Sequence, residues 1–265
     1  IVLTRTLDSA EYKVVLPGLQ RRLFDLEKAC WDNKIGSIVV FEGWDASGRG
    51  KAISAVTARL DPRGFKLHRI LPPAPHEAAR PWLWRFWMGL PNYGEMAVFD
   101  RSWYGRGVRD RVAEHVPETV WRQAYREILE FERMQADDGL AIVKFWLHIS
   151  RKEQKRRLKQ LEKNPLESWR VTEADWRAHK KYDKYLVAVE EMLHETDTEY
   201  APWTIVEATC KNYARRKLLE TLIKALEIRL GPLAPPRLQE EAQEEVDAEL
   251  REAMSAVEVA SGEES

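Results

Sequence analysis

The sequence predicts a three-layer α/β fold, in which a parallel sheet of about five strands is covered by helices on both faces. Two observations predict it. Short apolar runs alternate along the chain with longer amphipathic stretches, and strands separated by helices pair in parallel because each helix returns the chain to the starting edge of the sheet. The apolar fraction of 44% in 265 residues is sufficient for one large core.

The expected strands are the apolar runs at residues 38–41, 66–70, 96–99, 140–149 and 203–207. The expected helices occupy residues 16–33, 52–60, 81–90, 117–135, 151–163, 173–195 and 211–229. The first helix follows from apolar residues at three- and four-residue steps from Leu16 to Cys30. Pro81 suits a first helical turn, Ser150 and Thr172 open capping boxes, and Gly231 with the following proline ends the last helix.

Three parts are expected along the chain: an N-terminal lead-in and helix at 1–34, a core at 35–231 with a lid at about 151–182, and an acidic, flexible segment at 232–265. The charge distribution supports the last boundary. The whole chain has a net charge of −1, but residues 238–265 carry ten acids and one base, which leaves residues 1–237 at +8. A basic body of this kind attracts polyanions.

The strand at 38–41 runs into a glycine-rich turn and then a helix, which together form a cradle for an anion. Glycines let backbone N–H groups point inward, and the helix N-terminus adds partial positive charge. Arg49 and Lys51 can reach a phosphate, and Asp45 can hold a metal ion or orient a nucleophile. The spacing is not that of the standard P-loop, and an ordinary surface turn is the alternative. The expected phosphate-binding residues of this stretch are Gly43, Ser47, Gly48, Gly50 and Lys51.

A second charged group follows the strand at 96–99. Asp100 at the end of a buried strand matches the Walker B arrangement, in which the carboxylate serves a magnesium ion. Arg101, Arg106 and Arg109 supply bidentate phosphate donors. A structural salt bridge is the alternative for Asp100.

The basic helix at 151–163 and the loop around Arg170 follow the strand at 140–149, which is the position of a kinase lid. A solvated charged face is the alternative. Cys30 and Cys210 are too few and too far apart for a disulfide scaffold or a cysteine zinc site, and they fit a reducing cytoplasm. The six histidines show no metal-ligand spacing. We expect no membrane span and no secretion signal.

These motifs together resemble the second family of polyphosphate kinases, over about residues 10–230. The matching stretches are 42–48, 61–64, 83–87, 99–106, 143–150, 175–177 and 201–203. Several look most like the subgroup of polyphosphate:AMP phosphotransferases, which often carries two fused modules. One position departs from the family pattern, because Arg49 stands where the Walker A lysine is usual.

The resemblance implies a P-loop kinase core with a helical lid, and reversible transfer of a phosphoryl group from inorganic polyphosphate to AMP, then possibly to ADP. It implies Mg²⁺, or Mn²⁺, held by Asp45 and Asp100, and a homodimer or homotetramer. The expected catalytic residues are Asp45, Arg49, Asp100, Arg101 and Arg106. Lid cations that steady the transferred group are Arg156, Arg157 and Arg170. Weaker candidates for a polyphosphate track are Lys66, Arg80 and Arg122, beside Arg109.

Three alternatives remain at this point. An ATP-dependent nucleoside monophosphate kinase needs the same parts. A catalytically weak polyphosphate-binding or regulatory protein is suggested by Arg49. Binding of nucleic acid by the basic body is disfavoured, because the aspartates beside the arginines repel a bare phosphate backbone. We therefore expect polyphosphate and adenine nucleotides as partners, with no nucleic acid and no membrane.

Overall fold

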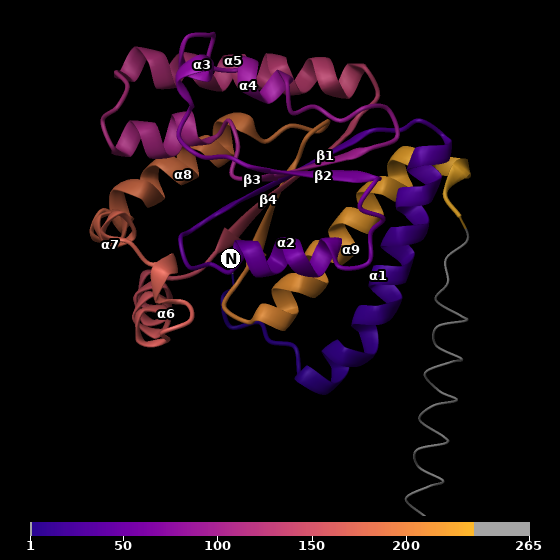
Figure 1. The fold of residues 1–265 in the computed structure, drawn as a ribbon, viewed down its shortest axis with the longest axis horizontal. Helices are drawn as coiled ribbons and strands as arrows, with labels where there is room; N and C mark the ends of the chain where they lie inside the picture. The colour runs from indigo at the N-terminus through magenta and orange to yellow at the C-terminus, as the bar shows by residue number, and fades with distance from the viewer. Residues whose placement is uncertain (1, 236–265) are drawn as a thin grey trace, which may run out of the picture.

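A computed structural model describes residues 2–235 of the chain. Figure 1 shows one sheet between two helical layers, with two further helices beyond one end of the strands. The acidic segment predicted from residue 238 onward lies outside the described residues. Within residues 2–235, no helix is both long enough and apolar enough to span a bilayer.

All five strands are parallel and are arranged in the order β2-β3-β1-β4-β5. Their bounds are β1 Ser37–Gly43, β2 Phe65–Arg69, β3 Met96–Asp100, β4 Ala141–His148 and β5 Trp203–Glu207. The central strands β1, β3 and β4 are buried almost throughout, as expected of apolar strands covered on both faces. In β1 and β3, Phe41 lies opposite Asp100, so the loops that follow these two strands meet at one edge of the sheet.

In Figure 1, α1, α2 and α9 cover one face of the sheet, and α3, α4, α5 and α8 cover the other. Helices α6 and α7 lie beyond the carboxyl ends of the strands. The helix bounds are α1 Ser9–Asp32, α2 Arg49–Thr57, α3 Pro75–Ala78, α4 Trp84–Trp87, α5 Glu118–Asp137, α6 Arg151–Lys163, α7 Glu173–Lys180, α8 Tyr182–Thr196 and α9 Lys211–Leu230. Short helical turns are η1 Arg106–Asp110, a π-helix, η2 Ser168–Arg170 and η3 Gly231–Leu233.

The predicted fold class is confirmed, but three helix predictions were wrong in extent. The first helix begins at Ser9, where the Asp8 side chain accepts a hydrogen bond from the N–H of Ala10 at 2.7 Å. The helix expected over 81–90 is reduced to a single turn at α4. The helix expected over 173–195 breaks at Lys181, whose φ of −93° and ψ of 16° are not helical. The break lets α8 pack on the core while α7 stays beyond the sheet edge.

A buried ion pair lies between the sheet and α5. Lys144 of β4 donates 2.8 Å hydrogen bonds to the Glu132 carboxylate, the Tyr104 hydroxyl and the Thr196 carbonyl. Glu132 also accepts from the indole N–H of Trp103 at 3.0 Å. Both Lys144 and Glu132 are fully buried. The network therefore fixes Trp103 and Tyr104, which follow closely after Asp100 in the chain.

We predict that Lys144→Met lowers the free energy of unfolding by about 3–5 kcal/mol, because it leaves the Glu132 carboxylate charged and uncompensated in the core. Urea denaturation measures the change. The double variant Lys144→Met/Glu132→Gln removes both charges and should recover part of the loss. A single variant within about 1 kcal/mol of wild type would contradict the prediction.

A second buried carboxylate joins α1 to the turn before β2. The Glu27 side chain accepts a hydrogen bond from the N–H of Asp61 at 2.8 Å. Its other oxygen, Oε1, is buried without a partner among the described residues. An added Cβ at Gly64 would lie 2.6 Å from that oxygen, so a larger residue there would displace the Glu27 side chain. Burial raises the pKa of Glu27 to about 7.

The folded state keeps a proton on Glu27, whereas the unfolded state releases it at a pKa near 4.5. Protonation of Glu27 therefore contributes fully to the free energy of unfolding below pH 4.5, and this contribution is lost as the pH rises towards 7. We predict that wild type loses stability relative to Glu27→Gln by up to about 1.4 kcal/mol per pH unit across this window. Urea midpoints of both proteins at a series of pH values measure the difference, and parallel curves would refute it.

Candidate functional site

The loop from Trp44 to Gly48 joins the end of β1 to the start of α2 in a tight turn. Gly43 has φ +148°, and a Cβ there would lie 2.6 Å from the carbonyl oxygen of Leu147 in the neighbouring strand. Gly48 has φ +97° and Ala46 has φ +61°. The first N–H groups of α2 have no partner within the helix and face this loop. Backbone of this shape before a helix N-terminus binds phosphate groups.

Two ion pairs cross between this loop and the end of β3. Arg49, at the start of α2, pairs with Asp100 at the end of β3. Arg101, the next residue, pairs with Asp45 of the loop at 2.7 Å. All four side chains are partly or largely shielded from solvent, and none is fully exposed. Two acids and two guanidinium groups are therefore held together at adjacent strand ends.

The surrounding carboxylates keep Arg49 charged. Burial acts against the charged form, but Asp100, Glu42 and Asp45 raise the pKa of Arg49 above its ordinary value. Its guanidinium also donates to the carbonyl oxygen of Gly43 at 3.3 Å. A cation is thus present at the Walker A position, where Arg49 stands in place of the usual lysine.

Arg101 has a left-handed backbone with φ +65°, which is strained for a residue other than glycine. Its N–H donates to the Phe41 carbonyl of β1 at 3.0 Å, which holds the strained conformation. Strain of this kind concentrates at functional sites, where surrounding structure fixes it. Here it turns the Arg101 side chain from the strand end towards Asp45.

Arg109 of η1 adds a third cation beside this group. Burial and the neighbouring Arg101 lower the pKa of Arg109 below its ordinary value. Its Nε is buried and has no partner among the described residues. Nearby, Glu42 is buried and accepts a hydrogen bond from the Ser102 hydroxyl at 2.9 Å. A bound anion would relieve the repulsion between the two arginines.

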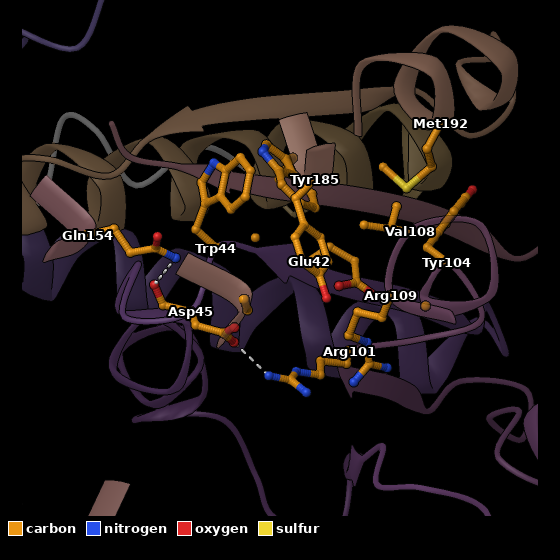
Figure 2. Close-up of a pocket in the computed structure, with 14 residues that line it drawn as sticks. Glu42, Trp44, Asp45, Arg101, Tyr104, Val108, Arg109, Gln154, Tyr185 and Met192 are labelled. Atoms are coloured by element: carbon orange, nitrogen blue, oxygen red, sulfur yellow. Dashed lines mark hydrogen bonds and ion pairs between the residues drawn. The ribbon is translucent and has the colours of Figure 1, made fainter. Parts of the chain in front are cut away.

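A small cleft of ≈ 40 Å³ opens beside these charges. In Figure 2, Arg101 and Arg109 lie on one side of it, Asp45 lies near Arg101, and Val108 and Met192 lie on the other side. The cleft is lined by β1, η1, β4, α6, α7 and α8. The cleft therefore extends from the charged group, which is Asp45, Arg49, Asp100 and Arg101, to side chains of α8.

Buried side chains connect the segment 151–182, predicted as the lid, to the loop from Trp44 to Gly48, which we call the phosphate loop. The side-chain amide of Gln154 donates to the Asp45 carbonyl at 3.2 Å, and its oxygen lies 2.7 Å from Nδ1 of His179 on α7. At the start of α8, Tyr182 stacks on Trp44 with ring centroids 4.1 Å apart. Movement of α6 or α7 is thus coupled to the loop that carries Asp45.

Arg157 of α6 is buried in the same contact. Its guanidinium donates to four backbone carbonyl oxygens, those of Ala46 at 3.2 Å, Ser47 at 2.8 Å, Ala208 at 2.7 Å and Thr209 at 2.9 Å. It is therefore bound to the phosphate loop and to the loop after β5, with no donor directed at the cleft.

The comparisons with known proteins agree with this geometry. The family model for Polyphosphate kinase 2 matches residues 6–231. The chain belongs to the polyphosphate kinase 2 family. It is 42% identical over 221 residues to a protein of Pseudomonas aeruginosa named polyphosphate:AMP phosphotransferase, with 83% of this chain and 45% of that protein covered. It is 38% identical over 214 residues to an AMP/ADP-polyphosphate phosphotransferase of Meiothermus ruber, with 80% of each covered.

The solved structure of polyphosphate kinase 2 from Arthrobacter aurescens matches with a TM-score of 0.82 and 29% identity, covering 85% of this chain and 83% of that one. The chain spans less than half the length of the polyphosphate:AMP phosphotransferases that it matches first. The family resemblance predicted from the motifs and the P-loop kinase fold are confirmed. A kinase of this family implies a divalent metal ion at its phosphate site.

In this polyphosphate kinase 2 family member, other predicted site residues are not in the two ion pairs that join Asp45, Arg49, Asp100 and Arg101. Lys51 lies 3.4 Å from the Glu167 carboxylate, so it joins α2 to the predicted lid, whereas Arg170 pairs with the same carboxylate at 2.9 Å within that lid. Arg106 lies 3.8 Å from Asp110 and over the ring of Trp82. The Ser47 hydroxyl is buried without a partner among the described residues, and an added Cβ at Gly50 meets open space.

Four other predicted cations lie outside this group in the structure. Lys66 pairs with Glu95 at 2.7 Å, beside the amino end of β3 and therefore at the opposite edge of the sheet. Arg80 lies 4.1 Å above the ring of Trp84. Arg122 pairs with acids on α5 and α8. Arg156 pairs with Glu153 on the exposed side of α6. Their roles in a polyphosphate track or on the transferred group stay predictions.

Sequence reasoning missed Glu42, Gln154 and Trp146 as residues of this site. Glu42 lay within the quoted phosphate motif, but its carboxylate had no assigned role. Gln154 is one polar residue in a very basic helix, and only the fold brings it to Asp45. Trp146 is an aromatic residue in a buried strand, where a core position is the ordinary interpretation.

We predict that Arg157→Ala lowers the free energy of unfolding by about 2–4 kcal/mol, because four buried or partly buried carbonyl oxygens lose their donors. The neighbouring Arg156→Ala is the matched control. It removes the same side chain from an exposed ion pair and should change stability by less than about 0.5 kcal/mol. Chemical denaturation of both variants tests this. Equal effects would show that the buried contacts of Arg157 add nothing.

Proposed function

We propose that this protein transfers a phosphoryl group from inorganic polyphosphate to AMP to give ADP, and further from polyphosphate to ADP to give ATP, in reversible steps. The observation that supports this most is the crossed pair of acids and arginines beside the phosphate loop, in a chain similar to proteins named polyphosphate:AMP phosphotransferase. The catalytically weak alternative is not favoured, because the relatives that the chain resembles are named as phosphotransferases.

The main requirement of this transfer is that the two anionic phosphate groups are aligned, and acid–base catalysis is less important. The bond between the terminal phosphorus and its bridging oxygen breaks, a bond forms to an oxygen of the AMP phosphate, and polyphosphate leaves one unit shorter. The attacking phosphate oxygen is already deprotonated at pH 7, since its second pKa is about 6. No general base is therefore required, and the protein's task is to offset negative charge and hold the line of attack.

In this proposal, Arg49 and the loop N–H groups bind the transferred phosphoryl group, and Arg101 and Arg109 bind the acceptor phosphate. When an anion binds, each arginine can exchange part of its ion pair with Asp100 or Asp45 for the phosphate oxygens. This exchange keeps each charge compensated at every stage, so no guanidinium is left buried and unpaired. The planar guanidinium groups can also donate two parallel hydrogen bonds each, which fixes the orientation of both phosphates.

Asp45 and Asp100 fit a Mg²⁺ ion, or Mn²⁺. Carboxylate oxygens are the ligands that Mg²⁺ prefers, and one or two of them suffice when substrate phosphates complete the shell. We place the ion at these two acids because each lies in or beside the loop from Trp44 to Gly48 and is paired there with an arginine. The buried Ser47 hydroxyl, unpartnered within the described chain, is a further oxygen nearby. When bound, the ion would neutralise charge on the polyphosphate chain.

The assay that tests the proposal supplies AMP and Mg²⁺ with either polyphosphate or ATP, and separates the nucleotides by chromatography. We expect ADP from polyphosphate. ADP formed from ATP alone would instead support an ATP-dependent nucleoside monophosphate kinase. A homodimer or homotetramer stays a prediction of the family resemblance, and a cytoplasmic location stays a prediction from the two cysteines.

We predict that Asp100→Asn reduces turnover to below about 1% of wild type without unfolding the chain, because it removes the charge that positions Arg49 and serves the metal. Arg101→Ala should have a similar effect. Asp110→Asn is the matched control, since Asp110 pairs only loosely with Arg106 at 3.8 Å, and it should stay close to wild type. Near-normal activity of Asp100→Asn, with circular dichroism to confirm folding, would remove Asp100 from the mechanism.

A further inference from the structure

The outer face of α1 carries an apolar stripe that is left exposed within residues 2–235. Its six positions follow one another at steps of three and four residues, which places them on one face of the helix. They are Val14, Pro17, Arg21, Phe24, Lys28 and Trp31. Val14 is 46% exposed, Phe24 37% and Trp31 50%, whereas Leu23 and Leu26 face the core. A surface helix normally turns charged residues outward, so this stripe is the kind of surface that another segment covers.

The two charged residues of the stripe are both cations. Lys28 pairs with Asp32 at 2.7 Å, and Arg21 lies 3.8 Å from Asp25, in each case one turn further along α1. Exposed ion pairs of this kind contribute little to stability, so a carboxylate from outside α1 can share either cation at small cost. The stripe therefore fits a segment that has apolar residues on one face and acids beside them.

The acidic end of the sequence has this composition. The family model ends at residue 231, so residues 238–265 lie beyond the part of the chain that the family shares. Apolar residues recur there at steps of four, four, three and four, with five acids between them, and this spacing predicts an amphipathic helix. These apolar residues are Ala242, Val246, Leu250, Ala253 and Val257. A helix over 242–257 is about 22 Å long and the stripe is about 26 Å long, so the two match in length.

The described chain ends where this segment can turn back along α1. Helices α1 and α9 run side by side in the same direction, since ion pairs of 2.8 and 2.7 Å join them at two points that are eleven residues apart on each helix, Glu11–Arg216 and Arg22–Glu227. Both helices therefore end at the amino edge of the sheet, and Figure 1 shows the last described residues, in yellow, beside that end of α1. The seven residues from 235 to 242 span up to about 23 Å when extended, which is sufficient for the turn.

We propose that residues 242–257 pack as a helix on the outer face of α1, antiparallel to it, with Ala242 beside Trp31 and Leu250 beside Phe24. The apolar residues of the segment cover the stripe, and its acids share the cations of the stripe. The occupant of this surface is thus the end of the same chain. This proposal does not depend on the proposed function, because α1 supplies none of the residues of the charged group.

Disulfide trapping in the full chain tests the contact directly. The double variant Phe24→Cys/Leu250→Cys places two thiols at the proposed contact. Phe24→Cys/Ala248→Cys is the matched control, because a residue two positions away points to the other side of a helix. After mild oxidation, non-reducing peptide mapping measures the cross-linked fraction, and we expect at least about 5-fold more of the first disulfide than of the second. Equal yields, or no cross-link in either variant, would overturn the proposal.

A mixture of ¹⁴N-labelled and ¹⁵N-labelled Phe24→Cys/Leu250→Cys identifies the occupant. We expect disulfides that join peptides of the same isotope only, because both cysteines belong to one chain. Disulfides between a ¹⁴N peptide and a ¹⁵N peptide would show that the segment of a second copy covers the stripe, as in a domain swap. A disulfide between two cysteines at position 24 would show that two copies of α1 meet there. Either result would overturn the assignment to the same chain.

Thermal unfolding of the full chain measures whether the contact stabilises the fold. Phe24→Glu and Leu250→Glu should each lower the melting temperature by about 3–8 °C, and the double variant by no more than the larger single effect. Val187→Glu is the matched control, since Val187 is 59% exposed on α8, on the other side of the sheet. It should shift the melting temperature by less than about 2 °C. An unchanged melting temperature of Leu250→Glu, or effects that add in the double variant, would contradict the proposal.

Discussion

The structure depends on one constraint, which is that two arginines and two aspartates must stay charged while they are largely removed from water. The parallel pairing of β1 and β3 makes this possible, since Phe41 lies opposite Asp100 and the loops after both strands meet. Asp45 then faces Arg101, and Asp100 faces Arg49. Each charge has a partner without any ligand, and in the proposed function each partner is exchanged for a phosphate oxygen or a metal ion.

Two sets of buried contacts hold these four side chains in place. Behind β3, the network around Lys144 and Glu132 fixes the chain that follows Asp100. On the other side, Arg157 fastens the carbonyl groups of the phosphate loop to α6 and to the loop after β5. The supporting residues are themselves charged and buried, so their removal should disturb the site as well as the fold. Preorganised charge of this kind is the main source of catalysis in phosphoryl transfer.

Much of the fold followed from local patterns in the sequence. The apolar strands, the glycine turn after β1 and the acid at the end of β3 are each encoded in a few neighbouring residues, and the structure confirms all five strands. The break at Lys181 was not predicted, because the amphipathic pattern continues across it and only packing of α8 on the sheet separates the helices.

The site was harder to predict than the fold, because side-chain partners are set over long separations in the chain. Asp45, Arg49, Asp100 and Arg101 were all named from their motifs, and the structure brings them together. Lys66 and Arg122 were named from charge alone, and their partners lie elsewhere. Trp146 could not be found from the sequence, since nothing in an apolar strand indicates that its side chain lines the cleft.

The central claim is that the acids and arginines act as one unit, and a double-mutant cycle between Asp45 and Arg101 tests it most directly. The measurement is kcat/KM for polyphosphate-dependent ADP formation in wild type, Asp45→Asn, Arg101→Met and the double variant, with melting temperatures to confirm folding. The account predicts a loss of at least about 100-fold in each single variant and no larger loss in the double variant than in the worse single one. Losses that multiply in the double variant would contradict it.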